Sequence, residues 1–311
     1  MILSTITLNP AVDKTYYVRN FTVNGLNRVD RVKVNMGGKG VNVAATAVKC
    51  GIHCTAGGFL SGYNGQQISK YVKDAGITAD FVHTEGETRI NIKVVDTENQ
   101  TYTDINEVGP EISAADRETL FTKISDMAAK SDYVYVGGSF HPCLGNDIYK
   151  RLIEIIKEKG AKAVLDADGE ALRLGIEAHP DIIKPNQTEL ESLIGTKIKT
   201  VSDVTRAAKA LCKNGVETVL VSLGGNGAVA AIGGRIYRVY ALNASVRSTV
   251  GAGDSFLCGY LYGLTVTEDA AEALQYAMAF ATAKIQTEGT DIPDFENLKQ
   301  DFGKVTVEIM E

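Results

Sequence analysis

The sequence predicts an α/β fold with a mostly parallel central sheet. Two observations carry this prediction: apolar strand patterns alternate with helical patterns from about residue 113 onward, and glycine-rich or polar motifs stand where the predicted strands end. Continuous apolar strands that alternate with helices are typical of a parallel sheet covered on both faces. Ligands of such sheets bind beyond the carboxyl ends of the strands. The motifs are therefore candidates for a binding site.

The individual elements are predicted from spacing and stop signals. Residues 146–159 place apolar side chains at helical spacing, and Gly160 follows as a stop signal. Gly233 and Gly234 separate two strand-like segments and predict a hairpin. The full set comprises a first strand in residues 1–8, helices over 114–130, 146–159, 202–214 and 267–286, strands over 133–136, 163–166, 181–184 and 218–222, and the hairpin strands 228–232 and 235–240.

Two pairs of early segments follow a different pattern. Residues 15–18 with 28–34, and 89–96 with 101–105, alternate polar and apolar side chains, as half-exposed antiparallel strands do. They interrupt the alternation of strands and helices. We therefore predict one domain, residues 1–311, with a small β-sheet lid formed by about 13–36 and 87–107.

The composition excludes several classes of protein. The chain has 311 residues, of which 44% are hydrophobic and 23% charged, and its formal net charge is −6. This balance argues against sequence-independent nucleic-acid binding, which needs a basic surface. Five cysteines without a C-x-x-C pair indicate neither a disulfide framework nor a zinc site. The sequence has neither a signal-peptide pattern nor an apolar run of roughly 18 residues, so we expect a cytoplasmic protein without a membrane partner.

The strongest motif is Thr249-Val250-Gly251-Ala252-Gly253-Asp254-Ser255, which precedes an apolar helical pattern. The N–H groups and the dipole at a helix start form an anion site. Gly251 and Gly253 let the backbone approach a phosphate, and Asp254 can take a proton from an attacking hydroxyl. Phosphoryl transfer needs this combination. The alternative is a glycine-rich turn in which Asp254 only stabilises the helix dipole.

A second glycine cluster, Met36-Gly37-Gly38-Lys39-Gly40-Val41-Asn42, opens another predicted helix. Its backbone amides and Lys39 could hold a sugar hydroxyl or a phosphate, and Asn42 can donate and accept hydrogen bonds. The pattern is not the G-x-x-x-x-G-K-[ST] phosphate loop. A tight strand-to-helix turn is the alternative.

The third motif, Lys184-Pro185-Asn186-Gln187-Thr188-Glu189, ends a predicted strand and begins a helix. Asn186 and Glu189 share the first helical turn, where they can orient water on Mg²⁺. They can equally form a capping box, in which each side chain bonds the backbone amide of the other.

Three weaker candidates stand at other predicted strand ends. The glycine-rich loop Ser222–Gly227 could bind a ligand or form a hairpin turn. Asp13 could bind sugar hydroxyls or cap a turn. Arg89, at the start of a lid strand, suits a phosphate but could be an exposed edge arginine.

Together and in this order, the motifs resemble the signatures of the ribokinase-like carbohydrate kinases, also called the PfkB family. G-G-K-G-x-N resembles the family's N-terminal signature, T-V-G-A-G-D-S its more specific C-terminal signature, and K-P-N-x-x-E its nucleotide and magnesium motif. The resemblance covers essentially the whole chain. It implies a ribokinase-like three-layer α/β/α sandwich, ATP and Mg²⁺ as cofactors, and a lid that often carries a homodimer contact.

The resemblance also implies a role for each matching residue. Asp254 would be the catalytic base, and an anion hole would be formed by the amides of Gly251, Ala252 and Gly253. The sugar would be bound by Asp13, Gly37, Gly38, Asn42 and Ser139. The nucleotide would be bound by Lys184, Asn186, Ser222, Gly224, Gly227, Gly251 and Gly253. Glu189 would act on Mg²⁺ through water.

Within the family, the chain is most similar to the 1-phosphofructokinases, with the tagatose-6-phosphate kinases next. Segments 88–93 and 103–106 favour the first group. We therefore expect transfer of the ATP γ-phosphoryl group to C6 of fructose 1-phosphate, with tagatose 6-phosphate as the alternative substrate. A phosphate on the substrate would account for Lys39, Arg89 and Arg28, which can clamp it through charge-assisted hydrogen bonds.

Two stretches depart from the pattern of this subgroup. Segment 137–142 keeps Ser139 but continues with the bulkier Phe140 and His141, and Asp168 stands where serine is commoner. Either change could reshape the sugar pocket.

Two other functional classes compete with a kinase. A nicotinamide oxidoreductase also uses glycine-rich loops, but no G-x-G-x-x-G follows the first strand. A catalytically inactive sugar-phosphate sensor could share the fold, but Asp254 and Glu189 are both intact.

Overall fold

The main sheet has ten strands in the order β14-β13-β12-β11-β10-β9-β8-β1-β4-β5 in the computed structural model, which describes residues 1–289 and 291–310. Neighbouring strands are parallel from β11 to β5, and β12, β13 and β14 form an antiparallel extension. The strands are β1 Ile2–Thr7, β4 His53–Ser61, β5 Thr78–Thr84, β8 Tyr133–Gly137, β9 Lys162–Asp166, β10 Ile182–Ile183, β11 Thr218–Ser222, β12 Ala228–Ile232, β13 Arg235–Val239 and β14 Val307–Met310.

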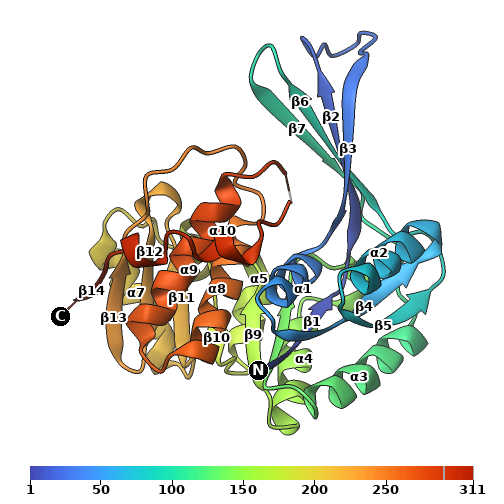
Figure 1. Ribbon diagram of the computed structural model, residues 1–311. Coiled ribbons are helices and arrows are strands. Elements are labelled where there is room, and N and C mark those ends of the chain that lie inside the picture. Colours follow the sequence, from blue (N-terminus) through green and yellow to red (C-terminus); the bar gives the residue numbers. More distant parts are fainter. Residues whose placement is uncertain (290, 311) are drawn as a thin grey trace.

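Helices cover both faces of this sheet and bury two separate cores (Figure 1). One layer comprises α1 Lys39–Lys49, α2 Gly62–Asp74, α8 Ala252–Val266 and α9 Ala270–Ile285, against which α10 Phe295–Lys299 packs. The other comprises α3 Ala114–Ala128, α4 Ile148–Glu158, α5 Gly169–Ile176, α6 Gln187–Ile194 and α7 Val201–Lys213. The predicted three-layer α/β/α sandwich with a mostly parallel sheet is thereby confirmed.

The local rules that predicted the elements also explain where they end. In α4, the side chains of Ile148, Leu152 and Ile156 form one stripe and are fully buried. The helix predicted from residue 267 begins only at Ala270, because the side chain of Asp269 caps it by accepting a hydrogen bond from the Ala271 amide. The strand predicted over 181–184 is only two residues long, since Pro185 has no amide to continue the ladder.

A separate four-stranded sheet extends away from the body of the molecule (Figure 1). Its order is β3-β2-β6-β7, with β2 Ala11–Val18, β3 Val29–Gly37, β6 Ile90–Asp96 and β7 Thr101–Asn106. The prediction of antiparallel strands was right for β2 with β3 and for β6 with β7, but β2 and β6 are parallel. A parallel pair needs a long crossover connection, and the segment between these strands passes through the main sheet.

Among the described residues, no helix combines the length and the apolarity needed to cross a membrane.

Candidate active site

Buried charges gather where β9 and β10 end and where α1 and α8 begin. Asp166 is the last residue of β9, and Lys184 follows β10. Lys39 begins α1, and Asp254 lies in the first turn of α8. The exposed fractions of Asp166, Lys184 and Asp254 are only 2%, 5% and 6%. Charges this deeply buried need partners, and Asp166 and Lys184 are partners for one another.

Asp254 is held by a contact from α1. Its Oδ2 accepts a 2.9 Å hydrogen bond from Nδ2 of Asn42. Burial raises the pKa of the Asp254 carboxyl and the charge of Asp166 adds to the effect, whereas Lys39 and Asn42 oppose it. A carboxylate with a raised pKa is a better proton acceptor than an exposed aspartate, as a general base requires.

The three amides of the predicted anion hole differ in their hydrogen bonds. Gly251 caps α8 with a φ of 76°, a conformation that glycine adopts without strain. The prediction for Ala252 needs correction, because its amide already donates to the carbonyl oxygen of Thr249 at 3.2 Å. Within the described part of the chain, no hydrogen bond uses the amide of Gly251 or of Gly253. These two amides remain available to an anion.

Lys39 and Lys184 share the carboxylate of Asp166. Lys39 Nζ lies 3.0 Å from Oδ1, and Lys184 Nζ lies 3.5 Å from Oδ2. Burial opposes ionisation of Asp166, but the two ammonium charges outweigh it and lower its pKa. The sequence reasoning missed Asp166 as a site residue. The available signal was a charged side chain at the end of an otherwise apolar parallel strand.

The sugar-side candidates lie at the base of the small sheet. Asp13 in β2 accepts a 3.0 Å hydrogen bond from Asn91 Nδ2 in β6, and burial raises its pKa. A Cβ atom on Gly37 would lie 2.0 Å from Asp13 Oδ2, so any other residue there would displace the Asp13 carboxylate. Gly38, with a φ of 122°, is the N-cap of α1. Asn91 is a second site residue that the sequence reasoning did not select.

Arg89 is clamped by neutral oxygens. Its guanidinium donates to Asn9 O at 3.2 Å, to Glu107 O at 3.1 Å and to Ser139 Oγ at 2.9 Å. Arg89 is half-buried, so the alternative prediction of an exposed edge arginine is wrong. These direct acceptors are neutral, and the carboxylates of Asp13 and Glu107 lie near enough to stabilise the charge of the group. Its remaining N–H donors suit an anion.

Arg28 is not brought to this cluster. It is exposed and stands immediately before β3, whose other end is Gly37. Arg28 therefore lies at the end of β3 that is remote from Gly37, and the predicted clamp within one chain does not include it.

Asn186 and Glu189 form the capping box that stood as the alternative to metal binding. Asn186 Oδ1 accepts from the Glu189 amide at 2.9 Å, and Glu189 Oε2 accepts from the Asn186 amide at 2.9 Å. Burial raises the pKa of Glu189, and Lys39 and Lys184 oppose this shift. The second carboxylate oxygen takes no part in the cap. Within residues 1–289 and 291–310, no group of three or more His, Cys, Asp or Glu side chains could hold a metal by itself.

The predicted nucleotide loop lies beside this cap. Ser222 forms a parallel bridge with Asn186, and Gly224–Asn226 is a 3₁₀ turn. Gly227 has a φ of 83°, and a Cβ atom on it would lie 2.1 Å from Val239 O. The loop is therefore a hairpin turn that connects β11 to β12, as one of the two interpretations predicted. Its role in ligand binding stays a prediction.

Phe140 and His141, which depart from the subgroup pattern, make local contacts that account for them. The ring of Phe140 packs edge-on against Tyr149 at a centroid distance of 5.6 Å. His141 caps the 3₁₀ turn Pro142–Leu144 by accepting from the Cys143 amide. Asp168 is an exposed residue at the start of α5. Neither of the two contacts involves Asp254 or Arg89.

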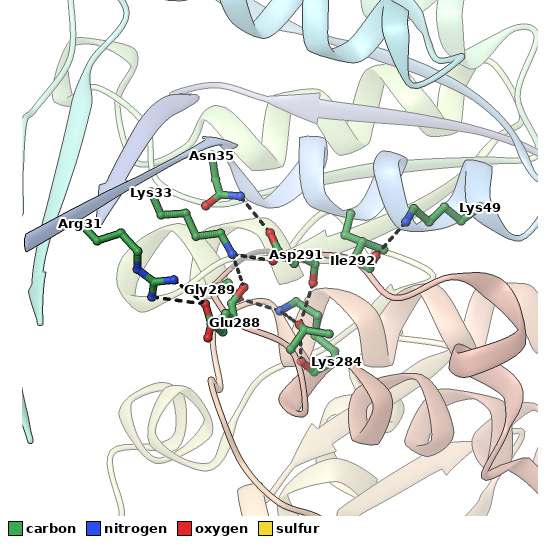
Figure 2. A network of polar contacts seen from close by, with 10 residues as sticks. Arg31, Lys33, Asn35, Lys49, Lys284, Glu288, Gly289, Asp291 and Ile292 are labelled. Carbon is green, nitrogen blue, oxygen red and sulfur yellow. Dashed lines mark hydrogen bonds and ion pairs between the residues drawn. The ribbon is translucent and has the colours of Figure 1, made fainter. Parts of the chain in front are cut away.

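A polar network ties the small sheet to the segment that follows α9 (Figure 2). Lys33 Nζ in β3 bonds Glu288 O at 3.0 Å and Asp291 Oδ2 at 2.5 Å. Lys284 Nζ in α9 donates to Gly289 O at 2.8 Å. A Cβ atom on Gly251 would lie 3.2 Å from Lys284 Cε. One segment therefore connects β3 with the start of α8.

The comparisons with known proteins agree with this geometry. The family model described as pfkB family carbohydrate kinase matches residues 6–297. This chain belongs to that family. Membership of the pfkB carbohydrate kinases excludes the competing nicotinamide oxidoreductase.

Individual relatives of this pfkB kinase match along nearly their whole length. The 1-phosphofructokinase of Rhodobacter capsulatus is 33% identical over 309 residues, 99% of this chain and 98% of the relative. That of Bacillus subtilis (strain 168) is 32% identical over 294 residues, 94% and 96% of the two chains. A Thermotoga maritima structure described as a possible 1-phosphofructokinase has a TM-score of 0.90 at 27% identity and covers 100% of both chains. Escherichia coli phosphofructokinase-2, solved with substrates and products, has a TM-score of 0.91 at 23% identity over 98% and 99% of the two chains and bears on the fold alone.

Proposed function

We propose that this pfkB kinase is a 1-phosphofructokinase, which transfers the γ-phosphoryl group of ATP to the C6 hydroxyl of fructose 1-phosphate. The single observation that carries the chemistry is buried Asp254, placed in the first turn of α8 beside the amides of Gly251 and Gly253. The near full-length similarity to 1-phosphofructokinases favours this acceptor over tagatose 6-phosphate.

In this proposal Asp254 takes the proton of the attacking hydroxyl as the phosphoryl group transfers. The bond between the C6 oxygen and phosphorus forms, the bond to the ADP oxygen breaks, and the proton leaves through Asp254 to solvent. Asn42 orients the carboxylate. The amides of Gly251 and Gly253 lie at the positive end of the α8 dipole and stabilise charge on the moving group.

The nucleotide would lie along Lys184, Asn186 and the loop Ser222–Gly227, beside the anion hole. Mg²⁺ usually takes most of its ligands from substrate phosphates and water, so a single carboxylate is enough protein for it. The capping geometry of Glu189 leaves one carboxylate oxygen for a metal-bound water. When bound, the ion neutralises charge on the β- and γ-phosphates.

The phosphate already present on the sugar would be bound by Arg89. Three neutral acceptors hold its guanidinium in place, so little side-chain entropy is lost on binding. Lys39 contributes positive potential at the same edge, although its direct partner in the structure is Asp166. Asp13 would accept hydrogen bonds from sugar hydroxyls.

We also propose that the small sheet is a lid in a single domain and that it pairs two copies of the chain. Val32, Val34 and Ile105 are exposed by 50%, 47% and 55%, and the strand register places them on one face. Apolar patches of this kind mark interaction surfaces. Sedimentation of the wild type beside Val34→Glu tests the pairing, and a monomeric wild type refutes it. We expect such a metabolic enzyme to act in the cytoplasm.

An ADP-release assay tests the function. The acceptors are fructose 1-phosphate, fructose 6-phosphate, tagatose 6-phosphate, fructose and tagatose. We expect the highest kcat/KM for fructose 1-phosphate. A higher value for tagatose 6-phosphate would reassign the substrate, and no ADP release with any acceptor would favour the inactive sensor.

A further inference from the structure

We propose that Asp166 is a positioning residue for phosphoryl transfer, whose buried carboxylate holds the ammonium groups of Lys39 and Lys184 at fixed places beside the anion hole. This inference rests on the proposed kinase function. No signature motif of the sequence contains Asp166, and its role follows from contacts alone.

The carboxylate is held rigidly from several sides. The side chain of Asp166 is completely buried, and Tyr135 donates to its Oδ2 at 3.3 Å. The carbonyl oxygen of Asp166 accepts from the Gly138 amide at 3.0 Å. A Cβ atom on Gly137 would lie 2.5 Å from that oxygen, so β8 and β9 approach one another as closely as glycine permits. A charge fixed in this way can fix its partners.

The two lysines come from different elements and face different parts of the site. Lys184 follows β10, and its Nζ lies 2.9 Å from where a Cβ atom on Gly253 would stand. Its ammonium group therefore lies against the anion hole. Lys39 begins α1, the helix whose Asn42 bonds Asp254. Each lysine has one Asp166 oxygen, so a single carboxylate sets the spacing of two cations.

The energetic case is that Asp166 offsets the cost of holding two ammonium groups in order at this place. Lys184 is 5% exposed, and an unpaired buried ammonium group would be strongly disfavoured. Burial lowers the affinity of Lys39 for its proton, and the Asp166 and Asp254 carboxylates reverse that effect and raise its pKa. Asp166 thus maintains two positive charges where the phosphoryl group passes. Oriented charges of this kind act without reorganisation during the reaction.

Loss of the Asp166 charge should also change the pH dependence of kcat/KM, which loss of a merely structural residue would not do. The groups that act on Asp254 are Asp166 from β9, Lys39 and Asn42 from α1, and Lys184 after β10. Lys284 acts on it from α9, which packs against α8 in the same helical layer. The charge of Asp166 raises the pKa of Asp254, so its removal lowers that pKa. The acidic limb of the pH profile of kcat/KM should move to lower pH.

The experiment compares Asp166→Asn with Asp181→Asn. Asn has the size of Asp but no charge, and Asp181 bonds the Ala163 amide at the opposite end of the same strands. For Asp166→Asn we expect kcat to fall at least tenfold and the acidic limb to shift downward, and for Asp181→Asn neither change. Wild-type kcat with an unmoved limb in Asp166→Asn overturns the inference.

Two further variants keep the inference falsifiable if Asp166→Asn does not fold. Lys39→Arg and Lys184→Arg keep the positive charge but change where it lies. If Asp166 positions these cations, each variant loses at least tenfold in kcat at an unchanged melting temperature. Wild-type kcat in both would overturn the inference.

Failure of the substrate assignment can be told apart. Binding of Mg·ATP without sugar is measured by calorimetry for the same proteins. A wild type that binds Mg·ATP but turns over no sugar phosphate refutes the proposed function. The positioning role of Asp166 is then tested by the affinity of the protein for Mg·ATP. This affinity should weaken at least fivefold in Asp166→Asn and in Lys184→Arg. An unchanged affinity would contradict the role.

Discussion

The side-chain amide of Asn42 donates a 2.9 Å hydrogen bond to Oδ2 of Asp254, across 212 residues of sequence. This contact joins the start of α1 to the start of α8, so the two glycine-rich motifs form one site. Asn42 was predicted to bind sugar, and in the structure it is the hydrogen-bond donor to the Asp254 carboxylate. The consequences of this pair can be measured.

Replacement of Asp254 by Asn should remove the base and little else. We expect kcat to fall by roughly 10²–10⁴, with the dissociation constant for ATP nearly unchanged, because the amide cannot accept the hydroxyl proton. Steady-state kinetics and calorimetry measure the two quantities. Asp269→Asn, which alters a capping aspartate on α9, is the matched control and should keep wild-type kcat. Near-wild-type turnover in Asp254→Asn would contradict the assignment.

Replacement of Asn42 by Ala should change the pH profile. The hydrogen bond from Asn42 stabilises the charged carboxylate and so lowers the pKa of Asp254. Its loss raises that pKa, and the acidic limb of kcat/KM should move to higher pH. This shift is opposite in sign to the one expected for Asp166→Asn. Asn297→Ala, on the exposed side of α10, should leave the limb where it is.

Much of this architecture follows from local sequence rules. The alternation of apolar strands and amphipathic helices predicted the layers, because burial on both faces of a parallel sheet requires it. The motif ending in Asp254 and the capping box of Asn186 and Glu189 were visible because their geometry depends on residues three or four positions apart. These features are local in sequence.

The features that escaped prediction are long-range. Lys39 and Asp166 are 127 residues apart, and nothing in either motif specifies the partner. The parallel pairing of β2 with β6 depends likewise on where the chain returns after the main sheet. Arg28 could not be placed because its position depends on the length and direction of β3. Spacing along the chain carries no information on such contacts.

Replacement of Arg89 by Ala should affect the sugar phosphate selectively. A charge-assisted hydrogen bond contributes roughly 1.5–3 kcal/mol, so KM for fructose 1-phosphate should rise about 10- to 100-fold while KM for ATP changes little. Unphosphorylated fructose should show no comparable difference between variant and wild type. Arg206→Ala, on the surface of α7, is the control. An equal rise in both KM values would contradict the phosphate clamp.

Lys284 should produce an alkaline limb in the pH profile. Burial lowers its pKa to about 8, so the ammonium group is charged below this pH and loses its proton above it. The charged form donates to Gly289 O and to Thr287 Oγ1, and its stem lies beside Gly251. We expect kcat of the wild type to fall above pH 8. Lys284→Met keeps the length of the stem and should have a lower kcat without that limb. A wild-type alkaline limb in Lys284→Met would show that another group titrates there.

Replacement of Gly253 by Ala should separate catalysis from stability. Gly253 lies in the first turn of α8, where Ala is favoured over Gly by about 1 kcal/mol, so the backbone should not be destabilised. The new Cβ atom would lie 2.9 Å from Lys184 Nζ and would displace the ammonium group from the anion hole. We expect kcat to fall at least tenfold and KM for ATP to rise, at a melting temperature no lower than that of the wild type. Gly303→Ala is the matched control, since a Cβ atom there meets nothing within 4 Å. Unchanged kcat in Gly253→Ala would mean that neither the approach to this amide nor the position of Lys184 matters for transfer.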